Sequence, residues 1–406
     1  MAEKPKAGKN DHRVIGKELD LFSFQNKAGA GLPLIHPKGA IIRDIIEDFW
    51  KQEHRKRGYE LVWTPHIFKL DLFKTSGHYG NYKKFMFLTE VDKTKYAIKP
   101  MNCPGTILIY KDTNHSYKEL PLRYAELGTC YRNELSGVLG GLFRVRSLTI
   151  DDAHIFCTPE QAEQEVKGVA NLIIDFYKVF GFKDVKTELS TMPKKHIGTP
   201  AMWKKSEAIL EKALKSNKLK YKINKGEGAF YGPKIDFHVK DNQGRNWQLG
   251  TIQLDFNMPD RFKLRYVGED NKPHKPVCIH RAVMGSFERF FGILIEHYNG
   301  AFPLWLSPVQ VKVITFTDRN EKYAQKVAKQ FTDAGLRIEL DDRTESVQKK
   351  VREAELQKIP YIIVCGDKEQ KAKTIAVRQR SVKKIKYKVK PKTFIKQLKK
   401  QIEAKK

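Results

Sequence analysis

The chain has 406 residues, of which 40% are hydrophobic, so it is long enough for two or three domains with cores of their own. Its 76 lysine and arginine residues against 47 acidic residues give a net charge of +29, which favours a polyanionic partner such as nucleic acid over an ordinary small-molecule enzyme. A lysine bias of the whole proteome is the alternative, because many lysines are interspersed with acids on expected helix faces.

Hydropathy and cysteine spacing limit the location and the redox chemistry. No run of 18 or more apolar residues occurs, and the first residues, MAEKPKAGKN, contain no apolar stretch, so we expect no membrane span, no secretory signal and a cytoplasmic protein. The five cysteines are widely and irregularly spaced, which argues against a disulfide framework in a reducing compartment. We expect free thiols or metal ligands.

Three regions follow in chain order. Residues 1–20 are polar and are expected to form a frayed N-terminal tail. Residues 21–302 combine amphipathic helical patterns with alternating strands such as PLRYAELGTCYRNE, which predicts an α+β domain with an antiparallel sheet. After a linker, AFPLWLSP, residues 309–406 alternate strands and helices and predict a small α/β domain with a mostly parallel sheet. This last region contains 27 basic and 12 acidic residues, so it carries more than half of the net charge.

Three short segments of the long domain carry residues suited to chemistry. In CYRNE, residues 130–134, strand alternation sends Arg132 and Glu134 to one face, where they could equally form a structural ion pair. In AVMGSFERFF, a Gly-Ser turn enters a helix bearing Arg289, which suits close approach and clamping of a phosphate. In KPMNCPG, Cys103 lies between a strand and a helix, where a buried apolar cysteine is the ordinary interpretation.

Together these motifs resemble the class II aminoacyl-tRNA synthetases. CYRNE is similar to the second signature motif of that class, GSFER to the third, and WKQEHRKRGYELVWTPHI, with Pro65, to the first, which forms the homodimer interface in the family. KPMNCPG, DDAHIF, CIHRAVMGSFERF and YIIVCGDKE resemble the threonyl-tRNA synthetases specifically, over almost the whole chain from about Asp11. The resemblance implies a class II antiparallel sheet, a C-terminal anticodon-binding domain, and ATP-dependent ligation of L-threonine to tRNA(Thr).

The resemblance also implies a metal site. Cys103, His154 and His280 match the three zinc ligands of the threonyl family, with one Zn²⁺ per chain, although they lie far apart in the sequence. In the family, the amino group and the hydroxyl of threonine bind the remaining positions of the metal, so valine, which lacks the hydroxyl, is rejected and serine is not. A hydrogen-bonded histidine at position 154 and a core histidine at position 280 are the alternatives.

Other roles are implied position by position. Arg132 and Arg289 match the arginines that hold the phosphates of ATP, which binds with Mg²⁺. His78 matches a histidine proposed as general base for transfer to tRNA, with positioning of the terminal adenosine as the alternative. The remaining matched positions are Glu134 for the adenine amino group, Arg144 for a further phosphate contact, Met101, Asp152, Tyr231, Lys234 and Gln253 for the threonine pocket, and Glu369 and Arg378 for the anticodon.

The sequence departs from the family pattern at several positions. Thr106 stands where a histidine is common, Ile150 where many members have glutamine, and Thr344 where an asparagine often contacts the anticodon. Residues behind the pocket and the details of anticodon reading are therefore expected to differ. Bacterial relatives usually carry two further N-terminal domains, one of which hydrolyses seryl-tRNA, whereas this sequence begins almost at the catalytic core. We therefore expect no editing of seryl-tRNA.

Two other functions are alternatives. A binding module or regulatory paralogue could keep the fold without catalysis, although such proteins tend to lose motif arginines or metal ligands, and all are present here. A prolyl or seryl synthetase would share the motif arginines but would not need the Cys/His/His set. Amino-acid-dependent pyrophosphate exchange separates the three possibilities.

Overall fold

The computed structural model describes residues 8–241 and 244–405. Contacts divide the chain into two units, which are described separately. Unit 1 contains the described residues up to 23, residues 34–46 and those from 294 onward, and unit 2 contains residues 24–33 and 47–293. Helices α2 (Pro37–Lys56) and α9 (Phe287–His297) each contribute to both units. Within the described ranges, no helix is long and apolar enough to cross a membrane.

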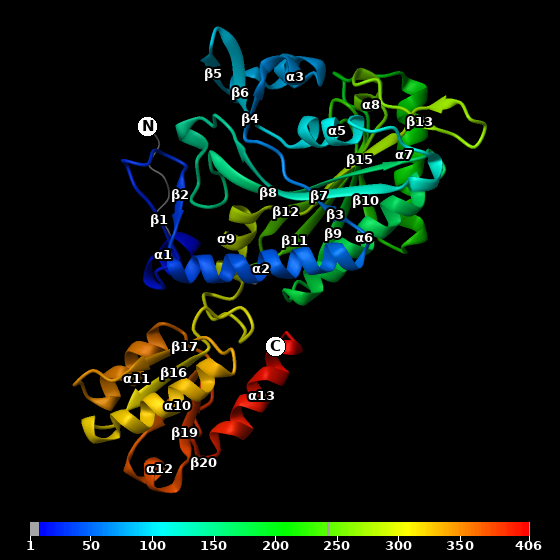
Figure 1. Cartoon of the computed structure of the whole chain (residues 1–406). Coiled ribbons are helices and arrows are strands. Elements are labelled where there is room, and N and C mark those ends of the chain that lie inside the picture. The colour runs from blue at the N-terminus through cyan, green and yellow to red at the C-terminus, as the bar shows by residue number, and fades with distance from the viewer. Residues whose placement is uncertain (1–7, 242–243, 406) are drawn as a thin grey trace. The chain divides into compact units, whose positions relative to one another are not determined.

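The core of unit 2 is an eight-stranded sheet (Figure 1). Its six central strands pair antiparallel, as predicted, while the edge pairs β10–β9 and β3–β7 are parallel. In spatial order the strands are β10 (Tyr221–Asn224), β9 (Val185–Ser190), β11 (Lys234–Lys240), β12 (Asn246–Asp255), β15 (Val277–Ser286), β8 (Ser147–Cys157), β7 (Leu122–Tyr131) and β3 (Glu60–Leu61).

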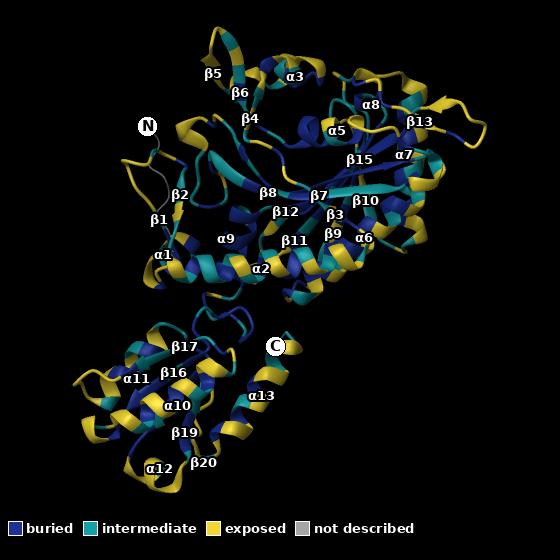
Figure 2. Ribbon diagram, in the orientation of Figure 1, coloured by how far each residue is buried: buried dark blue, intermediate teal, exposed yellow. Residues whose placement is uncertain are grey.

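Helices cover both faces of this sheet. On one face, α6 (Ala162–Val179) packs against β12 and β15 and against α7 (Pro200–Ser216), and its buried residues recur at helical spacing from Val166 to Phe176 (Figure 2). On the other face, Ile107 and Tyr110 of α5 (Cys103–Lys111) pack with Phe156 of β8. Side chains next to Phe156 on this second face therefore lie between the sheet and α5.

Shorter elements complete unit 2. A three-stranded sheet has the order β4 (Ile67–Lys69), β6 (Thr94–Ile98), β5 (Phe87–Val91). The two-stranded pairs are β1 (Phe22–Phe24) with β2 (Pro33–Ile35), which crosses the unit boundary, and β13 (Tyr266–Val267) with β14 (Pro273–His274). The short helices are α3 (Leu70–Thr75), α4 (His78–Tyr82), α8 (Met258–Arg261), η1 (Lys83–Phe85), η2 (Tyr117–Glu119) and η3 (Ser136–Val138).

The C-terminal part of unit 1 contains a five-stranded sheet in the order β17 (Ile338–Asp341), β16 (Val311–Thr315), β18 (Tyr361–Cys365), β19 (Ile375–Gln379), β20 (Lys386–Val389). The first three strands are parallel, but β18–β19 and β19–β20 are antiparallel, so the sheet is mixed rather than mostly parallel. The connection at residues 366–374 is too short for a parallel crossover, which needs about a dozen residues or more. The helices are η4 (Asp318–Asn320), α10 (Glu321–Asp333), α11 (Val347–Leu356), α12 (Asp367–Ala372) and α13 (Pro391–Glu403).

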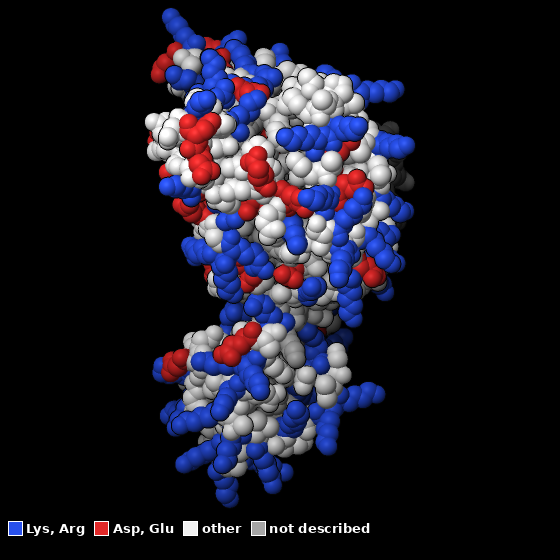
Figure 3. Space-filling model, turned by 90° about the vertical axis from the view of Figure 1, so that its right-hand side faces the viewer, with Lys and Arg blue, Asp and Glu red and all other residues white. Residues whose placement is uncertain are grey.

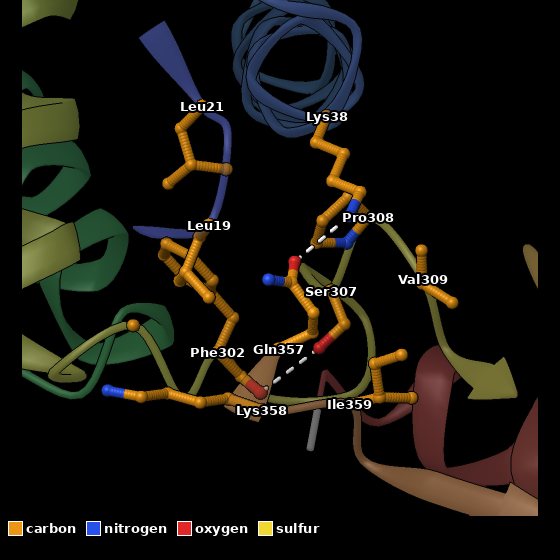
Figure 4. Close-up of a pocket in the computed structure, with 11 residues that line it drawn as sticks. Leu19, Leu21, Lys38, Phe302, Ser307, Pro308, Val309, Gln357, Lys358 and Ile359 are labelled. Atoms are coloured by element: carbon orange, nitrogen blue, oxygen red, sulfur yellow. Dashed lines mark hydrogen bonds between the residues drawn. The ribbon is translucent and has the colours of Figure 1, made fainter. Parts of the chain in front are cut away.

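The prediction of a frayed tail over residues 1–20 is wrong for His12–Glu18, which form the capped helix α1 with buried residues, and residues 1–7 lie outside the described residues. Asp11 caps its first turn, and the ring of His12 bonds to Glu296 of the same unit at 2.7 Å. Leu19 and Leu21 then line a cavity of about 20 Å³ with Lys38, Gly300, Phe302 and residues 307–309 and 357–359 (Figure 4). This volume suits about one water molecule, so the cavity is a packing defect and not a ligand site.

Basic side chains gather on the C-terminal part of unit 1. In Figure 3, lysine and arginine outnumber acidic residues over the lower part of the view. Exposed lysines there include Lys386, Lys388, Lys392, Lys396, Lys399 and Lys400 of β20 and α13. The excess of positive charge counted in the sequence therefore lies on an accessible surface.

Candidate active site

A row of polar side chains crosses four neighbouring strands of the large sheet. His154 of β8 lies opposite His280 of β15. His280 in turn lies opposite Gln253 of β12, which lies opposite Lys234 of β11. Residues directly opposite one another in paired strands point to the same face, so all four line the face covered by α5. The fold thus brings together residues that no local sequence pattern connects.

Cys103, at the first turn of α5, completes a buried cluster with the two histidines. Ligand atoms of Cys103, His154 and His280 lie within 4.8 Å of one another, and the two rings stand nearly perpendicular with centroids 4.8 Å apart. Among the described residues, both ring nitrogens of His154 and Nδ1 of His280 lack a hydrogen-bond partner. The interpretation of His154 as a hydrogen-bonded sheet histidine is therefore wrong.

The chemistry of this cluster fits a zinc ion. Burial raises the pKa of the Cys103 thiol and lowers the pKa of His154, each well away from its ordinary value. The buried polar atoms are thus left unsatisfied unless a cation binds them, and one sulfur with two imidazole nitrogens is a zinc donor set. Asp255 Oδ2 lies 3.0 Å from His280 Nε2, an arrangement that orients a ligating histidine and that the sequence analysis missed.

The residues predicted for the threonine pocket surround this cluster. Tyr231 donates its hydroxyl hydrogen to Gln253 Oε1, and its ring centroid lies 5.3 Å from that of His280. Lys234 Nζ bonds to Asp236 Oδ2 at 2.7 Å. Asp152, two residues before His154 on the same face of β8, is buried and accepts a hydrogen bond from Asn102 Nδ2 at 3.3 Å. Met101 packs against the hydrophobic cluster that contains Cys103.

Three arginines form a positively charged group beside this pocket. Arg132 Nε donates to Pro100 O at 3.2 Å, and Arg289 Nε donates to Phe143 O at 3.2 Å. Burial lowers the pKa of Arg289, and the nearby charges of Arg144 and Arg132 lower it further. Such mutually repelling guanidinium groups bind anions well because an anion relieves their repulsion.

Glu134 pairs with a different arginine from the one considered in the sequence analysis. Its Oε2 accepts a hydrogen bond from Arg144 Nε at 3.0 Å, so the ion pair joins Glu134 to Arg144 rather than to Arg132. The guanidinium of Arg132 lies instead 5.7 Å from the ring centroid of Tyr82. Arg132 therefore keeps its charge unneutralised by Glu134.

His78 begins α4 and is buried. Its Nδ1 lies 2.7 Å from Ser76 Oγ, and its ring packs edge-on against Phe230. Burial lowers its pKa to about 3, and the nearby charges of His280, Arg261 and Arg132 add to this shift. The imidazole is therefore neutral at physiological pH and only weakly basic.

Besides Asp255, sequence reasoning missed three more buried charged residues around the site, namely Asp151, Lys99 and Glu126. Asp151, the neighbour of Asp152, faces the opposite side of the sheet and accepts hydrogen bonds from Trp50 and from three backbone N–H groups. Lys99 and Glu126 form a buried pair behind the pocket. A tandem aspartate on a strand was the available signal for Asp151, since alternation sends one of the two to the other face.

Glu369 and Arg378, the predicted anticodon contacts, line one groove of about 410 Å³ in unit 1. The groove also contains the exposed aromatic side chains of Phe316 and Tyr387. Glu369 Oε2 accepts a hydrogen bond from the backbone of Gly366 at 3.2 Å, which caps α12. Two exposed aromatic rings and an arginine in one groove suit stacking of unpaired bases.

Comparison with known proteins agrees with this geometry. Residues 84–298 match the tRNA synthetase class II core domain (G, H, P, S and T), and residues 310–401 match the anticodon binding domain. Threonine–tRNA ligases of Carboxydothermus hydrogenoformans and Magnetococcus marinus are 55% and 52% identical over 376 and 386 residues, or 93% and 95% of this chain. Those matches cover 59% and 60% of the relatives, so the chain spans about three fifths of their length.

Solved structures give the same assignment. A crystal structure described as the RNA binding domain of threonyl-tRNA synthetase from Cryptosporidium parvum superposes with a TM-score of 0.92 at 40% identity, covering 96% of this chain and 98% of that chain. Prolyl-tRNA synthetase from the same organism shares the fold, with a TM-score of 0.76 at 15% identity. The chain, a class II core followed by an α/β anticodon-binding domain, belongs to the threonyl-tRNA synthetase family.

Proposed function

We propose that this chain is a threonine–tRNA ligase, which activates L-threonine with ATP and transfers it to tRNA(Thr). The observation that carries the proposal is the buried Cys103, His154 and His280 cluster beside three arginines on the same unit. The relatives named threonine–tRNA ligase support it. A binding paralogue would not need this cluster, and neither would a prolyl or seryl synthetase.

Cys103, His154 and His280 would hold one zinc ion, and the row of side chains beside them would hold threonine. A bound zinc ion supplies coordination positions for the amino group and the hydroxyl of the substrate. Asp152 lies two residues from His154 on the same face, where its carboxylate can accept a hydrogen bond from the substrate. Valine has no hydroxyl, and a site built for a polar group rejects its apolar isostere strongly.

Adenylate formation requires the threonine carboxylate to attack the α-phosphorus of ATP and to release pyrophosphate with its Mg²⁺. Negative charge grows on the phosphate oxygens as the new bond forms. Arg132 and Arg289 would stabilise this negative charge. A backbone carbonyl holds each guanidinium in place, and the two positive charges repel each other until an anion binds between them. Arg144 is bonded to Glu134 in this structure. When the adenine amino group binds Glu134 instead, Arg144 would be released to contact a phosphate of ATP.

Transfer to tRNA would use His78 and the basic C-terminal domain. The pKa of His78, about 3, favours a role in positioning the terminal adenosine over a role as general base, since an efficient base has a pKa near the working pH. Glu369 and Arg378 would contact the anticodon in their shared groove. The exposed lysines there would bind phosphates without regard to sequence.

Pyrophosphate exchange with threonine, valine and serine tests this proposal. We expect exchange with threonine, none above background with valine, and exchange with serine at a kcat/KM lower by about 10- to 200-fold, the value of one methyl group. Cys103→Ser should lose both bound zinc, measured by atomic absorption, and threonine-dependent exchange. Full threonine activation by metal-free wild-type protein would contradict the zinc assignment.

Three further expectations stay predictions. A homodimer, measured by sedimentation equilibrium, is consistent with the strongly exposed Trp63 in the segment that resembles the first motif. Hydrolysis of preformed seryl-tRNA(Thr) is expected at the spontaneous rate and is followed with and without the protein. Cell fractionation tests the cytoplasmic location.

A further inference from the structure

Asp151 lies on the face of the large sheet opposite the zinc cluster and is fully buried. Its carboxylate accepts hydrogen bonds from three consecutive backbone N–H groups, those of Val283 at 2.8 Å, Met284 at 2.9 Å and Gly285 at 2.9 Å. The indole of Trp50 donates a fourth at 3.1 Å. Three successive backbone amides that bond to one side chain, and not to a neighbouring strand, call for a structural explanation.

The three amides belong to an irregular segment between the metal cluster and the phosphate-binding arginine. The pairing of β15 with β8 shifts register between Ala282 and Ser286, after which the chain enters α9 with Arg289. Gly285 has φ of +79°, and a Cβ there would lie 2.8 Å from Leu249 O. Bulges of this kind redirect a strand and leave ladder groups unpaired, and here Asp151 binds the unpaired N–H groups.

The chemistry of this contact requires an ionised carboxylate. Burial raises the pKa of Asp151 to about 6, while the charge of Arg281 and the backbone N–H groups act in the opposite direction. The group is therefore ionised at pH 7.5, with acceptors only. An asparagine has nearly the same shape but would direct an NH₂ donor at N–H donors.

A second link joins the same strand to the start of α9. Glu288, the residue before Arg289, accepts a hydrogen bond from the backbone N–H of Thr149 at 2.9 Å. Strand β8 thus holds the bulge through Asp151 and the helix entry through Thr149, and it also carries His154. These contacts connect the strand that carries His154 to the segment that leads into Arg289.

We propose that Asp151 is a positioning residue for ATP: by binding the 283–285 bulge it sets the guanidinium of Arg289 relative to Arg132 and the zinc ligands. The inference rests on the proposed function and adds a residue to it. Asp151 contacts no substrate. Its loss should misplace Arg289 without removing it, and the threonine pocket on the opposite face should keep its shape.

Asp151→Asn tests the proposal in pyrophosphate exchange with zinc-loaded protein. We expect kcat/KM for ATP to fall by about 10- to 100-fold, the effect of a small misplacement of a catalytic group. Zinc content and KM for threonine should stay within about twofold of wild type. Glu165→Gln is the control, because Glu165 of α6 is another carboxylate with little exposure, bonded to Arg123 of β7 at 2.6 and 2.7 Å. Within the described part of the chain, its side chain makes no hydrogen bond to the 283–285 bulge, so the variant should lose stability with unchanged ATP kinetics.

A double-mutant cycle with Arg289→Ala separates positioning from general damage. If Asp151 acts through Arg289, Asp151→Asn should cost less than about threefold in the Arg289→Ala background. An equal loss in both backgrounds, or unchanged ATP kinetics of Asp151→Asn, would overturn the proposal. If Asp151→Asn does not fold, Trp50→Phe is the second variant, because it removes one hydrogen-bond donor to the Asp151 carboxylate. We expect a higher KM for ATP with an unchanged KM for threonine. Unchanged ATP kinetics of Trp50→Phe would equally overturn the proposal. Absence of threonine-dependent exchange in the wild type would instead contradict the proposed function.

Discussion

Lys99 and Glu126 form a buried pair behind the proposed threonine pocket, and Lys99→Met should destabilise unit 2 strongly. Lys99 Nζ lies 3.6 Å from Glu126 Oε2 and donates to Thr64 O at 3.1 Å and Thr64 Oγ1 at 2.8 Å. The hydroxyl of Thr64 donates to Glu126 Oε1 at 3.0 Å. Glu126 lies opposite Asp152 across the β7–β8 pair. The positive charge of Lys99 therefore offsets the repulsion between these two buried carboxylates.

The magnitude follows from what the substitution leaves behind. Methionine keeps the length of the lysine but not its charge, so Glu126 becomes a buried carboxylate without a cation, at a cost of about 3–5 kcal/mol. Burial raises the pKa of Glu126, Lys99 lowers it and Asp152 raises it. Without Lys99, Glu126 binds a proton more readily in the folded state than in the unfolded state, so the variant should regain stability as pH falls. Lys99→Met with Glu126→Gln removes both charges and should lie within about 2 kcal/mol of wild type.

Urea unfolding of zinc-loaded wild type, both single variants and the double variant at pH 7.5 measures the coupling. Tryptophan fluorescence reports unfolding, and KM for threonine reports whether the pocket beside Asp152 is disturbed. We expect a coupling energy of at least about 2 kcal/mol that favours the paired state. A cost below about 1 kcal/mol for Lys99→Met, or additive single effects, would refute this reasoning.

Three further predictions concern the arginines, the proposed anticodon groove and a buried histidine. Arg132→Ala and Arg289→Ala should each slow adenylate formation by about 100-fold or more with little change in the melting temperature, and wild-type exchange rates in either would remove that residue from the site. Arg378→Glu should weaken tRNA charging but not pyrophosphate exchange, and equal charging would contradict the assigned groove. Burial, with a contribution from Arg281, lowers the pKa of His54 well below its ordinary value, so stability should fall as pH drops below about 6.5, with a slope approaching about 1.4 kcal/mol per pH unit. His54→Gln should show a shallower slope in urea unfolding at pH 7.0, 6.0 and 5.5.

Periodicity in the sequence predicted the elements that bury one face. The apolar spacing of α6 and the alternation of β7 each reflect a local geometry that repeats along the chain, so both are visible without tertiary information. Helix α1 was missed because its seven residues include only two large apolar side chains, and its burial depends on Glu296, distant in the sequence. The antiparallel β19 was predictable in principle from the short connection before it.

The candidate site likewise contains residues that the sequence indicated and residues that only the structure shows. The motif resemblance led to Cys103, His154, His280 and the arginines, which the structure brings together. The sequence could not indicate the partners of Asp151 or Lys99, because the bulge of β15 and the buried carboxylate of Glu126 exist only in the folded chain. Alternation along β8 does predict that Asp151 and Asp152 face opposite sides of the sheet. It does not predict that Trp50 and the 283–285 backbone bind Asp151 there.

The row of His154, His280, Gln253 and Lys234 makes the protein unequally tolerant of changes in length. One residue inserted within β12 before Gln253 would turn that side chain to the α6 face and break the row, because side chains alternate with a period of two. Residues added at the tip of the β13–β14 hairpin lengthen the path between His154 and His280 without altering either strand. A tag or a second module within this domain is therefore best inserted at a connection such as residues 268–272, where added residues leave the row of side chains in register.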